Sequence, residues 1–147
     1  MGQQQLLLVI LVTIIVGIAT VVAINTFSSA ADSANVDAVR QDIASLAASA
    51  QSYYMKPDML GGGGKTFTGI TFDDLAFPTN GAESSGATTV SNENGNYSIT
   101  VTNSGADLEI DATPSSAGGL VEATVTQDNL DMGSYNPEGT EVSKVGS

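Results

Sequence analysis

The chain has 147 residues, with sixteen acidic and four basic side chains and a formal net charge of −12 at pH 7. It contains no cysteine and no histidine, which excludes disulfides and thiolate metal sites and removes the commonest general base, so we expect neither an enzyme nor a bound cofactor. The cations, Arg40, Lys56, Lys65 and Lys144, are spread along the chain, and without a basic patch no nucleic acid is expected as a partner.

The first 31 residues carry no charged side chain. Within them, Leu6–Ile24 reads LLLVILVTIIVGIATVVAI, and as a helix it would reach about 28 Å, enough to cross the apolar core of a bilayer. We therefore expect residues 1–27 to form a membrane-anchor helix with its MGQQQ end on the cytoplasmic side. A cleaved secretory signal is one alternative, although the usual basic n-region is missing. A plain signal anchor for a surface domain is another.

Small residues recur along this apolar segment. Thr13 and Gly17 are four positions apart, as are Ala19 and Ala23. Such spacing lets helix backbones approach closely where no hydrophobic force drives them together, so it favours packing against other helices.

From Ser28 the composition changes to alanine, serine and acidic residues, while apolar side chains keep a helical spacing. Residues 28–56 are predicted to continue the same helix with one apolar face and one polar face, and Pro57 should end it near residue 55. The apolar positions are Val39, Ile43, Leu46, Ala50 and Tyr53 or Tyr54; the polar side includes Asp37, Gln41, Asp42, Ser45, Ser49 and Ser52.

The whole helix would be roughly 80 Å long. A domain of about ninety residues cannot bury that length, so the apolar half must find lipid or copies of itself. We expect the helix to be weakest at Ser28–Asn35, where serine, aspartate and asparagine side chains compete for backbone hydrogen bonds.

Residues 57–147 are predicted to form a β-rich globular region that begins with a flexible four-glycine break at Gly61–Gly64. The fold class is therefore α+β, a long helix packed on an antiparallel meander of about four strands. Asp107, Glu109 and Asp111 should share the wet face of one strand, while the helical apolar stripe covers the opposite face of the sheet. Strand character is found at Thr66–Phe72, Ala87–Ser91, Tyr97–Thr102, Ala106–Asp111 and Leu120–Thr126, with turns at Asn94–Asn96 and Asn103–Gly105.

Two short motifs have both a structural and a functional interpretation. Asp128 and Asp131 offer oxygen ligands for calcium, but their spacing is not that of an EF-hand, and we favour a solvated acidic loop over a metal site. Asn96-Tyr97-Ser98 is a glycosylation sequon, but an asparagine at a turn has sufficient structural reason to be there, and we favour that role.

The charge-free N terminus, the apolar helix, its alanine-rich continuation ending in AQSYYMKP, the glycine loop and the meander together resemble type IV pilins and pseudopilins. The resemblance covers residues 1 to about 56 in pattern and the rest only in architecture. AQSYY is similar to the QYY-type ends of the first helix in many pilin-like chains. The chain departs from the family in lacking a proline in the apolar helix and a C-terminal disulfide loop.

The resemblance implies a structural subunit that waits in a prokaryotic inner membrane, is extracted by a pilus assembly machinery and polymerises with identical subunits into an extracellular cell-surface filament. The major pseudopilin of a type II-like secretion system and a membrane-anchored surface domain remain alternatives. Gly2 would mark the cleavage site of a prepilin peptidase, followed by methylation of the new N terminus. The residues expected to mediate assembly are Gln5, Leu6, Ile10, Thr13, Ile14, Gly17, Val21 and Ile24.

Pilins usually carry a glutamate just before the apolar run, where this chain has Gln5. A neutral amide can donate and accept hydrogen bonds but does not titrate, whereas a buried carboxylate is costly unless it is paired. We therefore expect the N-terminal helix to contribute to assembly independently of pH. Any pH sensitivity should come from surface acids such as Asp107, Glu109 and Asp111.

Overall fold

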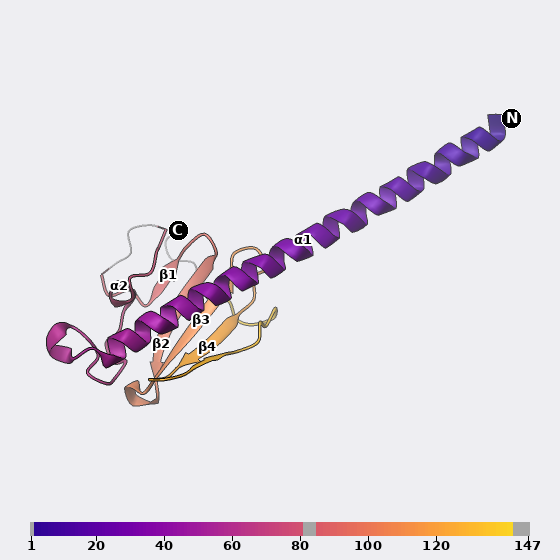
Figure 1. Ribbon diagram of the computed structural model, residues 1–147. Helices are drawn as coiled ribbons and strands as arrows, with labels where there is room; N and C mark the ends of the chain where they lie inside the picture. The colour runs from indigo at the N-terminus through magenta and orange to yellow at the C-terminus, as the bar shows by residue number, and fades with distance from the viewer. Residues whose placement is uncertain (1, 81–84, 143–147) are drawn as a thin grey trace. The chain divides into compact units, whose positions relative to one another are not determined.

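The computed structural model describes residues 2–80 and 85–142, and its contacts divide the chain into an N-terminal unit, Met1–Ala34, and a larger unit, Asn35–Ser147, here called the head. Figure 1 shows one long helix and an antiparallel sheet, as predicted for an α+β fold. The elements are α1 (Gly2–Met55), η1 (Asp58–Leu60), α2 (Phe72–Leu75), β1 (Thr89–Ser91), β2 (Gly95–Thr102), η2 (Asn103–Gly105), β3 (Asp107–Pro114), β4 (Val121–Val125) and β5 (Leu130–Met132).

Helix α1 is continuous, including the stretch Ser28–Asn35 where the sequence suggested a weak point. In that stretch the Ser33 hydroxyl donates to the Ser29 carbonyl over 3.0 Å, which satisfies the side chain within the helix. The division between the two units falls immediately before Asn35. Asn35 belongs to the head, where its amide donates to the Asn94 carbonyl over 2.9 Å.

The sheet is a meander in the order β1-β2-β3-β4-β5, with every neighbouring pair antiparallel. Alternation in β3 is as expected: Leu108 and Ile110 are fully buried, while Asp107, Glu109 and Asp111 point to the opposite face and are half-buried. The predicted helical stripe covers the apolar face of the sheet, because Val39, Ile43, Leu46 and Ala50 are buried in the same core as Tyr97, Leu108, Ile110 and Val121.

One polar contact ties α1 to the sheet side of this core. The Oδ2 atom of Asp42 accepts hydrogen bonds from the Tyr97 hydroxyl at 2.6 Å, Asn94 Nδ2 at 2.8 Å and Asn92 Nδ2 at 3.0 Å. Burial and the bonded Asp42 carboxylate raise the pKa of Tyr97, so the phenol stays protonated and donates. Asp42 was expected on a solvated helical face; it instead satisfies three donors from β2 and the turn before it.

The four-glycine segment is a close-packed cap of α1, and the prediction of a flexible break was wrong. Gly63 N donates to the Tyr53 carbonyl at 2.8 Å, and Gly64 N donates to the Lys56 carbonyl at 3.0 Å, which satisfies carbonyls at the end of the helix. A Cβ at Gly62 would overlap the Lys56 carbonyl, and one at Gly63 would overlap the Thr66 carbonyl. Glycine is needed there for close backbone approach.

Three further details of the sequence prediction differ from the structure. Thr66–Phe72 is not a strand, because a capping box between Thr71 and Asp74 starts the short helix α2. Gly95 opens β2 instead of lying in a turn, and a Cβ there would overlap the Thr113 carbonyl on β3. The fifth strand, β5, was not predicted, because three residues with an outward aspartate are too short to show alternation.

We predict that Asp42→Ala lowers the free energy of unfolding by about 3 kcal/mol, because it leaves three partly buried donors without their shared acceptor. Tyr97→Phe should cost about half as much. Asp37→Ala is the matched control, since Asp37 is exposed and makes only a 3.7 Å ion pair with Arg40; it should cost less than about 0.5 kcal/mol. Denaturant unfolding of the detergent-solubilised chain, followed by tyrosine near-UV circular dichroism, measures these losses. Equal losses for Asp42→Ala and Asp37→Ala would contradict the role given to Asp42.

Candidate assembly surface

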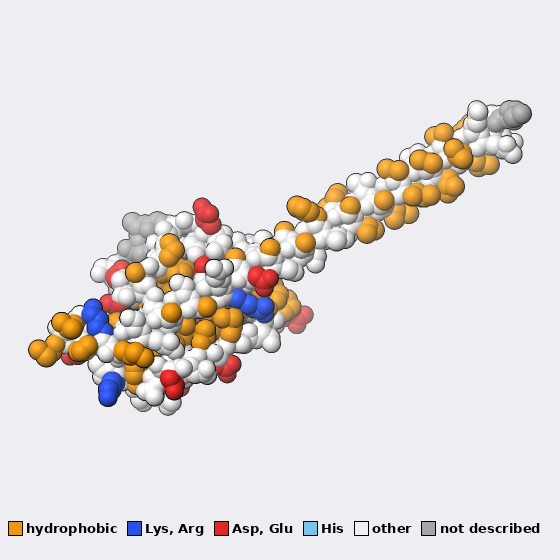
Figure 2. All heavy atoms as spheres, in the orientation of Figure 1, with side chains coloured by type: hydrophobic (Ala, Val, Ile, Leu, Met, Phe, Trp, Pro, Cys, Tyr) orange, Lys and Arg blue, Asp and Glu red, His pale blue; other side chains and the backbone are white. Residues whose placement is uncertain are grey.

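The N-terminal unit has no core of its own. Its large apolar side chains are exposed all around α1, from Leu6 at 64% to Phe27 at 78%. Figure 2 shows hydrophobic side chains along this part of the helix without acidic or basic ones among them. Such a surface is unstable in water and requires apolar surroundings.

The threonine hydroxyls within this segment are satisfied by the helix itself. The hydroxyls of Thr13, Thr20 and Thr26 donate to the carbonyls four residues earlier, over 2.7, 2.8 and 2.9 Å. A hydroxyl bonded in this way enters lipid or a helix bundle without leaving an unpaired donor. The helix is therefore suited to apolar surroundings along its length.

Seven of the eight residues predicted to mediate assembly fall on one side of α1. At about 100° per residue they lie within roughly 100° of arc. Gln5 lies outside that arc, one residue before the apolar run. The seven, which we call the assembly face, are Leu6, Ile10, Thr13, Ile14, Gly17, Val21 and Ile24.

Gly17 is the smallest residue of the assembly face, and a Cβ built on it would meet no atom of this chain within 4 Å. The chain's own packing therefore does not require glycine there. A shallow apolar depression on the same helix is lined mainly by residues outside the assembly face, among them Ala19 and Ala23, and also by Ile24 of that face. Of the two small-residue pairs seen in the sequence, Ala19 and Ala23 thus line a depression on the helix surface.

By length and composition, α1 is able to cross a membrane, and none of its most apolar stretch is buried within the chain. A signal sequence near an N terminus has the same properties. Met1, which bears on processing at Gly2, lies outside the described residues.

The head carries a cluster of carboxylates on the sheet face opposite α1. Oxygen atoms of Glu109, Asp111 and Glu122 lie within 4.8 Å of one another, because the antiparallel register places Asp111 directly opposite Glu122. Glu122 was not singled out in the sequence, since that pairing depends on the register of β3 with β4. Among the described residues, Asp111 Oδ1 is buried without a hydrogen-bond partner.

Burial and the neighbouring negative charges change the pKa of one carboxyl in this cluster. Burial, and then the charges of Glu109 and Glu122, raise the pKa of Asp111 to about 6. The face of β3 that was expected to be exposed to solvent is therefore partly covered. The covering segment is the C-terminal one, in which Val142 N donates to Thr113 Oγ1 over 2.8 Å.

The calcium candidates lie elsewhere. Asp128 is exposed in the turn after β4, where Oδ1 accepts from Thr126 Oγ1 at 3.4 Å, and Asp131 is exposed in β5. Neither belongs to the close group of three carboxylates found among the described residues. In the sequon, Asn96 Oδ1 accepts from Ser91 Oγ over 2.9 Å, which gives this side chain a structural use.

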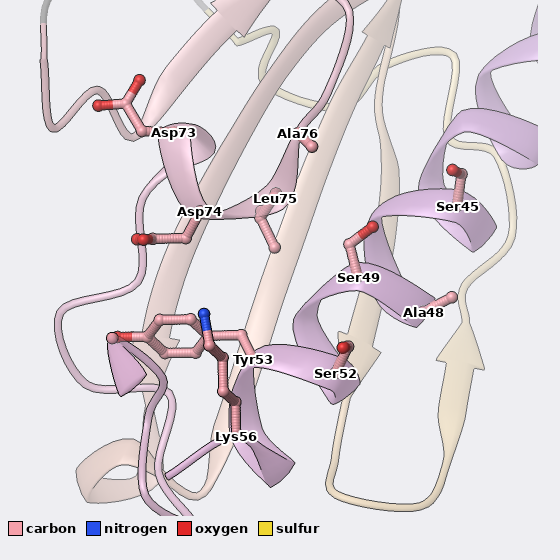
Figure 3. A pocket seen from close by; sticks show the side chains of 11 residues that line it. Ser45, Ala48, Ser49, Ser52, Tyr53, Lys56, Asp73, Asp74, Leu75 and Ala76 are labelled. Carbon is pink, nitrogen blue, oxygen red and sulfur yellow. The ribbon is translucent and has the colours of Figure 1, made fainter. Parts of the chain in front are cut away.

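A second hollow on the head, about 630 Å³ in volume, lies between the polar side of α1 and helix α2. Figure 3 shows Ser45, Ser49 and Ser52 on α1 facing it, with Lys56 and Tyr53 at one end. Its carboxylates already have structural partners: Asp74 closes the capping box of α2, and Asp73 accepts from Gly86 N over 2.9 Å. The hollow therefore reflects short side chains on the exposed side of α1.

Comparison with protein-family models, curated proteins and solved structures finds no match for this chain.

We predict that Asp111→Asn stabilises the head at neutral pH. The pKa of Asp111 is about 6 in the folded chain and near the ordinary 3.8 in the unfolded one, so the folded state binds more protons between these values and the parent loses stability as pH rises through this window. The variant should therefore melt about 3 °C higher than the parent at pH 7 and no higher below pH 4. Asp107→Asn, outside the cluster, is the control. A gain for Asp111→Asn that does not change between pH 4 and pH 7 would contradict the mechanism.

Proposed function

We propose that the chain is the structural subunit of a type IV pilus-like filament, in which the apolar half of α1 is first a membrane anchor and then part of the filament core. The observation that carries this proposal is the first half of α1: a helix without charged side chains before Asp32, exposed on every side, whose threonine hydroxyls are already bonded within the helix. Before assembly the subunit would lie in a prokaryotic inner membrane. Extraction from it would require an assembly machinery.

The energetic argument does not depend on the family resemblance. Keeping a large aliphatic side chain out of water is worth about 1.5 to 3 kcal/mol, so the N-terminal unit must exchange lipid for an equally apolar environment. A bundle of identical helices supplies it. Because lipid and helices are equally apolar, close packing at small residues such as Gly17 would select the bundle over the membrane.

The head supports an extracellular location for the rest of the subunit. It has its own core, completed by the stripe of α1 that begins at Val36. All of the chain's charged side chains except Asp32 lie in the head, which gives it a solvated, acidic surface.

The discriminating experiment is electron microscopy of material sheared from cells that express the chain, together with fractionation of the remaining membranes. Filaments in the sheared material, composed of this chain, support the pilus-like subunit. Short fibres that form only with a secretion apparatus would favour the major pseudopilin. Monomers that stay in the membrane would identify a plain anchored surface domain and overturn polymerisation.

We predict that Gly17→Leu reduces filament yield at least about tenfold, because the new side chain prevents close approach of a neighbouring helix. The subunit itself should remain folded and membrane-bound, since nothing in the chain contacts that position. Ala30→Leu is the matched control, because it places the same side chain on an exposed position of α1 that lies outside the assembly face and outside both small-residue pairs. Equal loss for both variants would refute the assembly face while leaving polymerisation intact.

We also predict that filaments of the parent keep their N-terminal contacts from acid to neutral pH, because Gln5 does not titrate. Gln5→Glu should assemble worse at neutral pH than at acid pH, where a buried carboxyl is uncharged and less costly. Gln3→Glu, further from the apolar run, is the control. Intact fibres counted across the pH range provide the measurement. Should Gln5→Glu assemble as well as the parent at every pH, the role given to the amide is wrong.

A further inference from the structure

An exposed apolar cluster lies where α1 ends and the chain turns into the glycine loop. Met59 is 96% exposed, and Met55 and Leu60 are 70% and 67% exposed. Among the described residues of the head, the next most exposed large apolar side chain is Val101 at 36%. The exposed lysines Lys56 and Lys65 lie in the same segment, and we call Met55, Lys56, Met59, Leu60 and Lys65 the basic tip. Figure 2 shows hydrophobic and basic side chains together on this part of the head.

The basic tip is held in a defined conformation. Gly62 N donates to the Pro57 carbonyl at 3.2 Å, and Lys65 N donates to the Tyr54 carbonyl at 2.9 Å. The two glycines that approach the backbone closely, Gly62 and Gly63, leave no space for side chains there. The apolar side chains are thus presented to the surroundings by a folded loop.

The segment 55–65 carries Lys56, Lys65 and one exposed acid, Asp58, so its net charge of +1 is opposite in sign to that of the rest of the head. The chain has four cations against sixteen acids, and two of the four are Lys56 and Lys65. Neither has an ion-pair partner among the described residues, whereas Arg40 pairs with Asp37. An acidic partner with some apolar surface would complement the basic tip.

The head itself carries such a surface. A groove of about 740 Å³ runs between the outer face of the sheet and the C-terminal segment. In the described part of the chain no cation lines it. Its charged and apolar lining residues, which we call the acidic groove, are Asp111, Glu122, Glu138, Glu141, Leu120 and Val142.

The acidic groove brings several carboxylates together, and no cation is found among its described lining residues. Among the described residues, Asp111 Oδ1 is buried without a partner, and burial, followed by the charges of Glu109 and Glu122, raises the pKa of Asp111. An ammonium group placed among these carboxylates would relieve their mutual repulsion. The flexible side chains of Met55 and Met59 would adapt to the nearby Leu120 and Val142.

We propose that the basic tip of one subunit docks in the acidic groove of a second copy of this chain. The two surfaces are different parts of one head, so the contact is heterologous: each subunit offers one tip and one groove. A heterologous contact that does not close into a ring produces an open helical polymer. This inference deepens the proposed function, on which it rests, by assigning the contact between heads.

Because the chain has no cysteine, introduced cysteines report the contact directly. Full-length Met59→Cys subunits are mixed with tagged Thr140→Cys subunits in membranes and oxidised; Thr140 lines the groove and is exposed. We expect a mixed disulfide dimer at a yield roughly tenfold above that from Met59→Cys with Thr100→Cys, an exposed threonine outside the groove. Equal yields for the two pairs would overturn the proposal.

Charge reversal provides the second arm. Lys56→Glu with Lys65→Glu should reduce the mixed dimer roughly fivefold, and Glu122→Lys with Glu138→Lys on the partner copy should restore it. Restoration cannot result from misfolding of either copy. Reduction without restoration would reject the pairing of these surfaces.

Two controls establish which groups meet in the groove and whether the contact belongs to a filament. Lys144 lies outside the described residues, and a mixed dimer that forms only after Lys144→Gln would assign the groove to the chain's own tail and overturn the proposal. Filaments without the mixed dimer would refute the head contact while polymerisation stands. A salt-sensitive mixed dimer without filaments would establish the contact and reject the filament.

Discussion

The uncharged half of α1 sets the requirement that the rest of the molecule must meet. Its large apolar side chains are exposed in the described part of the chain, and its threonine hydroxyls are bonded to its own backbone. It therefore forms a helix but has no core of its own. Water is a poor solvent for it. Lipid and a bundle of copies are two environments that would satisfy it, so the proposed anchoring and the proposed polymerisation would meet the same physical requirement.

The other half of the same helix has a different role, which is to cover the sheet of the head. The sheet has one apolar face, and the stripe of Val39, Ile43 and Leu46 is what covers it, so the head cannot be complete without this part of α1. Asp42 fixes the position of the helix on the sheet, because its carboxylate accepts hydrogen bonds from Tyr97 and from two asparagines in the turn before β2. Apolar burial holds helix and sheet together, while these hydrogen bonds select one register.

Features that depend on the periodic spacing of residues could be predicted from the sequence. Features that depend on which segments lie close together in the folded chain could not. The long helix, its end near Pro57, the covering stripe and the alternation of β3 were all predictable, because each follows from local spacing. The glycine cap, the capping box of α2 and the pairing of Asp111 with Glu122 were not. Each depends on which backbone or strand comes close, and that is fixed only by the folded chain. Of the candidate site, the apolar helix was evident in the sequence, whereas the acidic groove was not.

Charge is distributed along the chain in a way that bears on any polymer it forms. Bringing subunits of net charge −12, nearly all of it on the heads, side by side costs energy, since the apolar helices contribute no compensating cation. Screening by salt reduces this repulsion but does not remove it where carboxylates are partly buried, as at Asp111. Two of the few lysines lie beside the most exposed apolar side chains of the head, so cation and apolar contact are available at the same place. A head contact that places those lysines against carboxylates reduces the repulsion that helix packing alone leaves in place, and it does so in a direction that can repeat from subunit to subunit.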